Sequence, residues 1–267
     1  MRTTAILHKK GGVGKTVTAI NMASILAKDH HKRVLLIDAD DQHNASDFFG
    51  ADPDAPGLAD YLRGTANPYY PENLSCTDIP GLWLLPSCNQ LMDFDLSAIR
   101  HGMTNGMVLV DLFAAIAEDI AEDGRGTFDH IIVDCPPAFN AASTAALAAV
   151  DEVVIPLAID AFSMSGVANI LQQIINMREV NPRLRVAGLL ITKYYDLMQD
   201  KVTELVNLRA LPVYKTMIRD NRYYVAQSTF EGEPLPSYSP HCAAAIDYRR
   251  WVKEYLGEEA SKNGQAV

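Results

Sequence analysis

Glycines, a lysine and a threonine lie together near the start of the chain, and these residue types suit the binding of phosphate groups. Gly11, Gly12 and Gly14 let the backbone take positive φ and bring its N–H groups close to an anion. Lys15 supplies a positive charge for the β- and γ-phosphates, and the Thr16 hydroxyl is a suitable ligand for Mg²⁺. The segment therefore predicts a nucleotide-binding loop that works with Mg²⁺.

This loop departs from the usual phosphate-loop pattern, G-x-x-x-x-G-K-[ST], because Lys9 takes the place of the first glycine. Gly-Lys-Thr alone is weak evidence, and a glycine-rich connector with solvated lysines is the alternative. Nucleotide binding is favoured because the loop follows an apolar segment of strand type and precedes a segment of helical period.

Carboxylates follow two further apolar segments. Residues 34–37 run directly into Asp38 and Asp40, which share a face in extended chain, and residues 130–133 run into Asp134. In phosphate-transfer enzymes, carboxylates at such places hold Mg²⁺ or orient an attacking water. Asp is also common in solvated loops, so this interpretation depends on the order of the three elements along the chain.

The cysteines give little sign of chemistry. Cys135 adjoins Asp134, but no base or second cysteine lies near it in the sequence, so a nucleophilic or redox role is not expected. The chain contains no C-x-x-C pair, and we expect reduced thiols instead of a metal cluster or a disulfide framework.

The candidate residues need a scaffold that brings several strand ends together, and the hydrophobic pattern supplies one. Strands are predicted at residues 4–7, 34–37, 130–133, 153–156, 186–191 and 213–218, helices at 16–27, 108–121, 141–149, 163–180, 202–208 and 243–256, and a small hairpin at 74–85. This alternation predicts a single-domain α/β fold, with a mostly parallel twisted sheet and helices on both faces. Ligands of such sheets bind at the carboxyl ends of the strands.

Composition limits the classes of protein to consider. The 267 residues are 48% hydrophobic and 21% charged, as in globular domains, and the net charge of −10 excludes a protein that coats nucleic acid with its whole surface. No apolar run approaches the ~20 residues that span a bilayer, and residues 1–8 do not form a secretion signal. We expect a domain at residues 1–256, a polar tail at 257–267 and a cytoplasmic location.

Lys10 completes the loop, and residues 10–16, K-G-G-V-G-K-T, resemble the deviant phosphate loop of the ParA/MinD family of ATPases. Residues 34–46 resemble the family's second motif, residues 131–137 its Walker B strand, and residues 151–157 the strand that follows. The resemblance runs from residue 3 to about residue 256. It implies a phosphate-loop NTPase fold, ATPase activity, and ATP and Mg²⁺ as cofactors.

The resemblance also gives roles to matching residues. It implies that Asp134 holds the metal through water, with Thr16 and Asp38 beside it, and that Asp40 orients the hydrolytic water. The implied active form is a dimer that ATP closes and slow hydrolysis reopens. In this dimer, Lys10 would reach the nucleotide of the partner subunit and act in catalysis together with Lys15. The implied nucleotide-binding residues are Lys10, Gly11, Gly12, Val13, Gly14, Lys15, Thr16, Val17, Met217 and Arg219.

Two departures from the family pattern bear on the rate of hydrolysis. Val17 stands where the family usually has a second threonine, and Asp41 replaces the usual proline.

In layout the chain resembles the short, Soj-like partition ATPases: its phosphate loop begins within ten residues, which leaves no room for an N-terminal helix-turn-helix domain. Its tail offers no apolar face to a membrane. The implied partners are a second copy in the ATP state, non-specific double-stranded DNA and a centromere-binding ParB-type protein, with no membrane contact and a nucleoid-associated location.

The distribution of charge offers a surface for DNA. Residues 1–175 hold 10 Lys+Arg and 22 Asp+Glu, whereas residues 176–253 hold 12 and 8. The candidate DNA contacts in the basic region are Lys193, Lys215, Arg219, Arg222, Arg249 and Arg250. The tyrosines of this region, at 194, 195, 223 and 224, are expected to pack instead of stacking on bases.

Basic side chains are often only solvated surface, so two alternatives stay open: an ATPase that positions a protein complex without DNA contact, and a metabolic phosphate-loop enzyme.

Overall fold

The computed structural model of the protein describes residues 1–52, 54–63, 65, 74–88, 91, 94, 107–123, 128–159, 161–198, 200, 202–203 and 211–257, with backbone alone at 117–123 and 161–165. Seven strands form one sheet, in the order β3-β4-β2-β5-β1-β6-β7. All neighbours are parallel except β3 and β4. The strands are β1 (Arg2–Ile6), β2 (Val34–Asp38), β3 (Ser75–Cys76), β4 (Leu82–Leu85), β5 (His130–Asp134), β6 (Glu152–Ala158) and β7 (Arg185–Thr192). The prediction of a single α/β domain with a mostly parallel sheet is confirmed.

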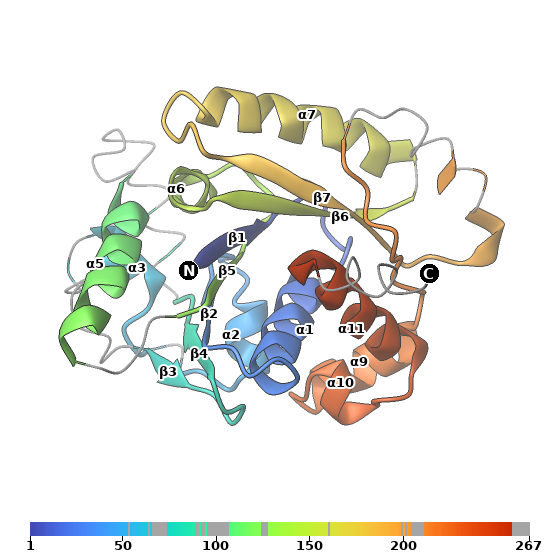
Figure 1. Cartoon of the computed structure of the whole chain (residues 1–267), viewed down its shortest axis with the longest axis horizontal. Helices are drawn as coiled ribbons and strands as arrows, with labels where there is room; N and C mark the ends of the chain where they lie inside the picture. The colour runs from blue at the N-terminus through green and yellow to red at the C-terminus, as the bar shows by residue number, and fades with distance from the viewer. Residues whose placement is uncertain are drawn as a thin grey trace, which may run out of the picture.

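Helices cover both faces of the sheet (Figure 1). One face carries α3 (Leu58–Arg63), α5 (Val108–Asp123), α6 (Ala141–Ala149) and α7 (Ala161–Met177), and the other carries α1 (Lys15–Lys28), α2 (Asn44–Phe48), α10 (Leu235–Tyr238) and α11 (Ala243–Leu256). A short helix, α9 (Arg222–Phe230), lies beside α10, and a 3₁₀ turn, η2 (Asp196–Met198), follows β7. Among the described residues, no helix combines the length and apolarity needed to cross a bilayer.

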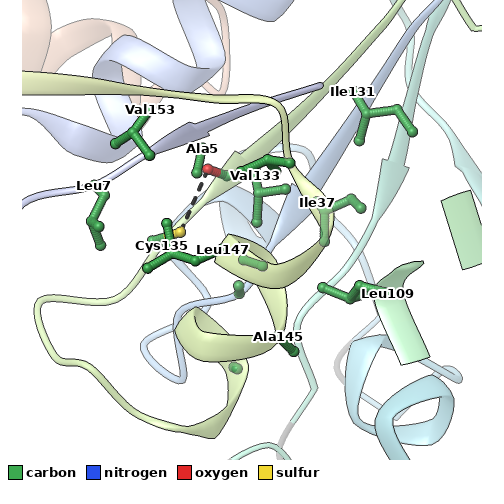
Figure 2. Close-up of a cluster of buried hydrophobic side chains, with 14 of the residues drawn as sticks. Ala5, Leu7, Ile37, Leu109, Ile131, Val133, Cys135, Ala145, Leu147 and Val153 are labelled. Carbon is green, nitrogen blue, oxygen red and sulfur yellow. Dashed lines mark hydrogen bonds between the residues drawn. The ribbon is translucent and has the colours of Figure 1, made fainter. Parts of the chain in front are cut away.

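The central strands are buried on both faces, which explains their continuous apolar runs. Successive side chains of β2 enter opposite cores: Leu35 and Ile37 pack on the α5–α7 side, and Val34 and Leu36 on the α1–α11 side. Figure 2 shows the first of these cores, where the side chains of β1, β2 and β5 meet those of α5 and α6.

Most predicted elements agree with the structure to within a few residues, and the predicted hairpin is the antiparallel pair β3–β4. The last strand, predicted at residues 213–218, was wrong. The segment and its end pair with β7 only as isolated bridges, at Val213 and Arg219, where Tyr214 and Ile218 donate their amides to β7 carbonyls. Between these bridges, Lys215 and Thr216 donate their amides to the Glu254 carboxylate of α11, at 2.7 and 2.9 Å, and this interrupts the strand pairing. Residues 204–208 of the helix predicted at 202–208 lie outside the described residues.

The register of the sheet brings the predicted site together. β5 lies between β2 and β1, with Asp134 opposite both Asp38 and Ile6. The chain leaves β1 at Ile6 and enters α1 at Lys15. The carboxylates and the phosphate loop therefore meet at the carboxyl ends of three adjacent strands, as the fold class predicts.

Candidate nucleotide and magnesium site

The phosphate loop connects β1 to α1 through two glycines in the left-handed region. Gly12 has φ +75° and Gly14 has φ +90°, a conformation that residues with a side chain rarely adopt. Gly14 is the N-cap of α1 and has no side chain to cover the first turn. The loop thus presents the positive end of a 14-residue helix at the position where an anion would bind.

Lys15 is placed between the loop and the carboxylates. Its side chain is buried, with the residue 7% exposed, and its Nζ lies 3.5 Å from the carbonyl oxygen of Lys10. Burial lowers the pKa of Lys15, and the negative charges of Asp134 and Asp40 oppose that shift. A buried ammonium facing two carboxylates is a charge held in place for a phosphate group.

Asp134 has the surroundings that best fit a metal ion. Both of its carboxylate oxygens are buried, and neither meets the geometry of a hydrogen bond with a described residue, although the nearby Thr16 hydroxyl lowers the pKa of this carboxyl. Burial raises the pKa of Asp134 well above its usual range, and the charge of Asp38 adds to the rise. A buried carboxylate without partners is costly, and a cation would supply the missing contacts.

Asp38 has a different environment. Its Oδ2 accepts hydrogen bonds from the Ser46 amide at 2.8 Å and the Ser46 hydroxyl at 2.7 Å, and its Oδ1 accepts one from the Asp40 amide at 3.1 Å. Burial nevertheless raises the pKa of Asp38 to about 6. Asp38 therefore shapes the loop between β2 and α2, in addition to bringing charge to the site.

Asp40 lies on that loop, and its Oδ1 accepts a hydrogen bond from the Gln42 amide at 3.1 Å. Burial raises its pKa, and the neighbouring Asp41 raises it further, while Lys15 lowers it. Asp41 thus adds negative charge directly beside the predicted water-orienting residue.

The residues present fit a magnesium ion that arrives with a nucleotide. Within the described part of the chain, no three His, Cys, Asp or Glu side chains converge to hold a metal by themselves. Mg²⁺ commonly binds through one or two carboxylates together with substrate phosphates and water. Asp134 and the hydroxyl of Thr16, which faces it closely enough to lower its pKa, provide that kind of partial site.

A further contact to the phosphate loop was missed from the sequence. Thr192, at the end of β7, donates its hydroxyl to the Val13 carbonyl at 2.8 Å, and both residues are buried. The two residues are 179 positions apart, and a threonine at a strand end gives no signal of such a contact. The bond joins the loop to the edge strand of the sheet.

Cys135 takes no part in this chemistry. It is fully buried, and its thiol points to the Val133 carbonyl at 3.9 Å (Figure 2). Burial raises the pKa of the thiol well above its usual value, so the reactive thiolate is disfavoured.

The segment predicted to lie beside the nucleotide base follows the end of β7. Ile218 donates its amide to the Ile191 carbonyl at 2.8 Å, which places Met217 and Arg219 near the strand end that holds the phosphate loop. The Arg219 guanidinium forms a two-bond ion pair with Asp247, at 2.7 Å for each contact. Val17, in the first turn of α1, lies directly after the loop.

The basic residues proposed for DNA differ in their surroundings. Arg249 pairs with Asp29 at 2.8 Å and also donates to two backbone carbonyls around α10, so it joins α11 to its neighbours. Arg222 pairs with Asp220 at 2.6 Å and remains exposed. Lys193, Lys215 and Arg250 are exposed.

The tyrosines of this region were expected to pack, and that expectation holds only for Tyr194, which is 9% exposed. Tyr195 is 49% exposed and Tyr223 is 67% exposed, while Tyr224 lies against Tyr223 edge to face at 5.4 Å. These side chains are therefore part of the surface.

Comparison with known proteins agrees with this geometry. A sequence model of a family described as “AAA domain” matches residues 1–186. The chain is 32% identical to the chromosome partitioning protein ParA of Caulobacter vibrioides, over 100% of this chain and 98% of that protein, and 32% identical to the chromosome-partitioning ATPase Soj of Thermus thermophilus, over 96% of each. The crystal structure of cobyrinic acid a,c-diamide synthase from Mycobacterium smegmatis, with bound ATP analog and magnesium, has a TM-score of 0.79 at 26% identity, over 98% of this chain and 96% of that one.

Proposed function

Because the chain belongs to the ParA/MinD family of ATPases and is Soj-like, we propose that it is the ATP-dependent switch of a DNA-partitioning system. It is an ATPase whose cofactors are ATP and Mg²⁺, and a partition or positioning protein in the broad sense. The observation that carries the proposal is the buried, partnerless Asp134 carboxylate beside Lys15, at the strand ends that meet the phosphate loop. Residues 1–256 would form the ATPase domain and residues 257–267 a polar tail.

The proposed hydrolysis depends on positions that the fold fixes. The loop amides and Lys15 bind the phosphates, and Asp134 with Thr16 would hold Mg²⁺, which neutralises phosphate charge when bound. Asp40 orients the attacking water, with its carboxylate held in place by the Gln42 amide. We expect Asp40→Ala to bind ATP normally and to lose turnover; loss of ATP binding would contradict this role.

The proposed switch is a homodimer that forms with ATP. Lys10 precedes the glycines at the surface end of the loop and is partly exposed, a position from which it can reach a second subunit. We expect Lys10→Ala to bind ATP as a monomer and to lose ATP-driven dimerisation, measured by light scattering. Undiminished dimers would remove Lys10 from the interface.

The proposed ligand of the ATP state is double-stranded DNA of arbitrary sequence, bound through phosphate contacts. The exposed basic residues Lys193, Lys215, Arg222 and Arg250 are the candidate contacts, together with Arg219 and Arg249 where their ion pairs allow. A DNA-shift assay with ATP, ADP or no nucleotide tests this. Binding should require ATP and fall steeply with salt, and absence of binding at low salt with ATP and Mg²⁺ would refute it. A centromere-binding ParB-type partner and a nucleoid-associated location in the cytoplasm complete the proposal.

A second candidate is an ATPase that positions a protein complex without DNA contact. The ion pairs Arg219–Asp247, Arg222–Asp220 and Arg249–Asp29 favour it, because they neutralise three of the six candidate DNA contacts. Reversing the charge of Lys193 and Arg250 separates the two candidates. A partition ATPase would lose DNA binding and partition activity together, whereas a positioning ATPase would keep its activity.

A further inference from the structure

Helix α9 presents an apolar stripe on its most exposed side. Ser228 is its buried residue, and Val225 flanks it on the inner side. On the opposite side lie Tyr223, 67% exposed, Ala226, and Phe230, 84% exposed, at the spacing of three, four and seven residues that places side chains along one face. Two exposed aromatic rings on one helix face are available for contact with another protein.

The order of residues along α9 is symmetric about its middle. Ala226 lies near the centre of the stripe, with Tyr223 before it and Phe230 after it, and Arg222 and Glu231 stand just outside the two rings. If two copies of α9 pack antiparallel about a two-fold axis, Tyr223 of one copy meets Phe230 of the other, and the small Ala226 lets the helices approach. The same axis brings Arg222 to Glu231 twice, so the surface complements itself, as a two-fold interface requires.

The charges at the helix ends favour the same arrangement. Arg222 stands at the N-terminus of α9 and Glu231 at its C-terminus, the reverse of what the helix dipole prefers within one helix. In an antiparallel pair, each end lies beside the opposite end of the second helix, where both charges become favourable. Arg222 directs two donors to Asp220, and a guanidinium has five, so it can hold Asp220 and a glutamate of a second copy together.

We propose that the exposed face of α9 is a contact between two copies of this chain, formed by Tyr223, Ala226 and Phe230 with Arg222–Glu231 ion pairs at both ends. The helix has nine residues, and two aromatic side chains offer roughly 300 Å² per copy, well below the ~800 Å² per partner of a stable interface. The contact is therefore weak by itself. It forms at high protein concentration, and it acts most strongly between molecules that another contact already holds together.

Cross-linking of the full chain without nucleotide tests this contact. Of the four cysteines only Cys76 is exposed, so Cys76→Ser provides the background. In that background, Ala226→Cys places a thiol near the proposed axis, and Lys253→Cys places one at an exposed position on a different helix, α11. A short bismaleimide should link Ala226→Cys into dimers many-fold faster than Lys253→Cys. Equal rates at the two positions would overturn the proposal.

Two further variants show whether the stripe and the charges cause the contact. Phe230→Ser should slow cross-linking through Ala226→Cys, whereas Leu197→Ser, which removes a side chain that is 92% exposed elsewhere, should not. Reversing either Arg222 or Glu231 should slow cross-linking, and reversing both together should restore it. Failure of the double reversal to restore the rate would refute the antiparallel pairing. Since no nucleotide is present, the result is independent of whether ATP drives a second contact.

Discussion

Thr192 gives a sharp test of how the fold holds the phosphate loop. Its hydroxyl donates to the Val13 carbonyl at 2.8 Å, and both residues are buried. Thr192→Val keeps the shape of the side chain and removes the donor, so the Val13 carbonyl stays buried without that partner. Thr192→Ser keeps the donor and serves as the conservative control.

The size of the effect follows from this bond. A hydrogen bond contributes about 1 kcal/mol, and a buried carbonyl left unsatisfied costs about 1–3 kcal/mol, so the loop's arrangement should lose about 2 kcal/mol. Ligand affinity falls with the fraction of molecules in the binding arrangement, and 1.4 kcal/mol corresponds to tenfold. We therefore expect Thr192→Val to raise the Kd for ATP up to about 30-fold, and Thr192→Ser to restore most of the loss.

A matched variant separates loop positioning from general destabilisation. Thr3 is equally buried, and its hydroxyl donates to Asp151 at 2.8 Å at the opposite end of the sheet. Thr3→Val should lower the free energy of unfolding by a similar amount and leave the Kd for ATP unchanged. Titration with a fluorescent ATP analogue and urea unfolding measure the two quantities. If Thr192→Val loses stability but binds ATP like the parent protein, the bond stabilises the fold alone and the reasoning is wrong.

Three other predictions concern buried charge. Asp134→Asn removes a buried carboxylate that lacks partners, so it should raise the free energy of unfolding of the ligand-free protein by about 0.5–2 kcal/mol. It should also remove the stabilisation that ATP with Mg²⁺ provides. A ligand-free variant that is less stable than the parent protein would argue against a buried charge without partners at this position. Burial lowers the pKa of His130 to about 4, below the unfolded value of about 6.5. The free energy of unfolding is therefore fully present above pH 6.5 and falls by up to about 3 kcal/mol as the pH drops towards 4. Urea unfolding at several pH values should show this fall, and His130→Phe should reduce it. Arg2 forms a 2.6 Å ion pair with the fully buried Glu152. Arg2→Met should lower the free energy of unfolding by about 3 kcal/mol, because the Glu152 carboxylate is left with fewer partners. A loss below 1 kcal/mol would show that Arg185, the other ion-pair partner of Glu152, suffices.

Local pattern was sufficient for much of the fold and for the choice of candidate site residues. The apolar runs of β1, β2 and β5 end at the residues where chemistry was expected, because strands buried on both faces read as continuous hydrophobic segments. Residue type and order alone predicted that the glycines of the loop would lie near Lys15, Asp38, Asp40 and Asp134, and the sheet register brings their strand ends together. The short helices α2, α3 and α10 were not predicted, since each has too few residues for a clear period, and α9 was not predicted either.

What the sequence determines by itself is which groups are candidates for binding a phosphate: a glycine-rich loop, a lysine and carboxylates that end adjacent strands. Only the tertiary structure decided how those groups differ. Asp38 is held by Ser46 while Asp134 is left without a partner, and Thr192 reaches the loop across the sheet. The same is true of the last predicted strand, where the Lys215 and Thr216 amides bond to Glu254 instead of β7, and of the tyrosines that stay exposed on α9. Burial and pairing arise from contacts between residues far apart in the chain, and a local pattern carries no record of such contacts.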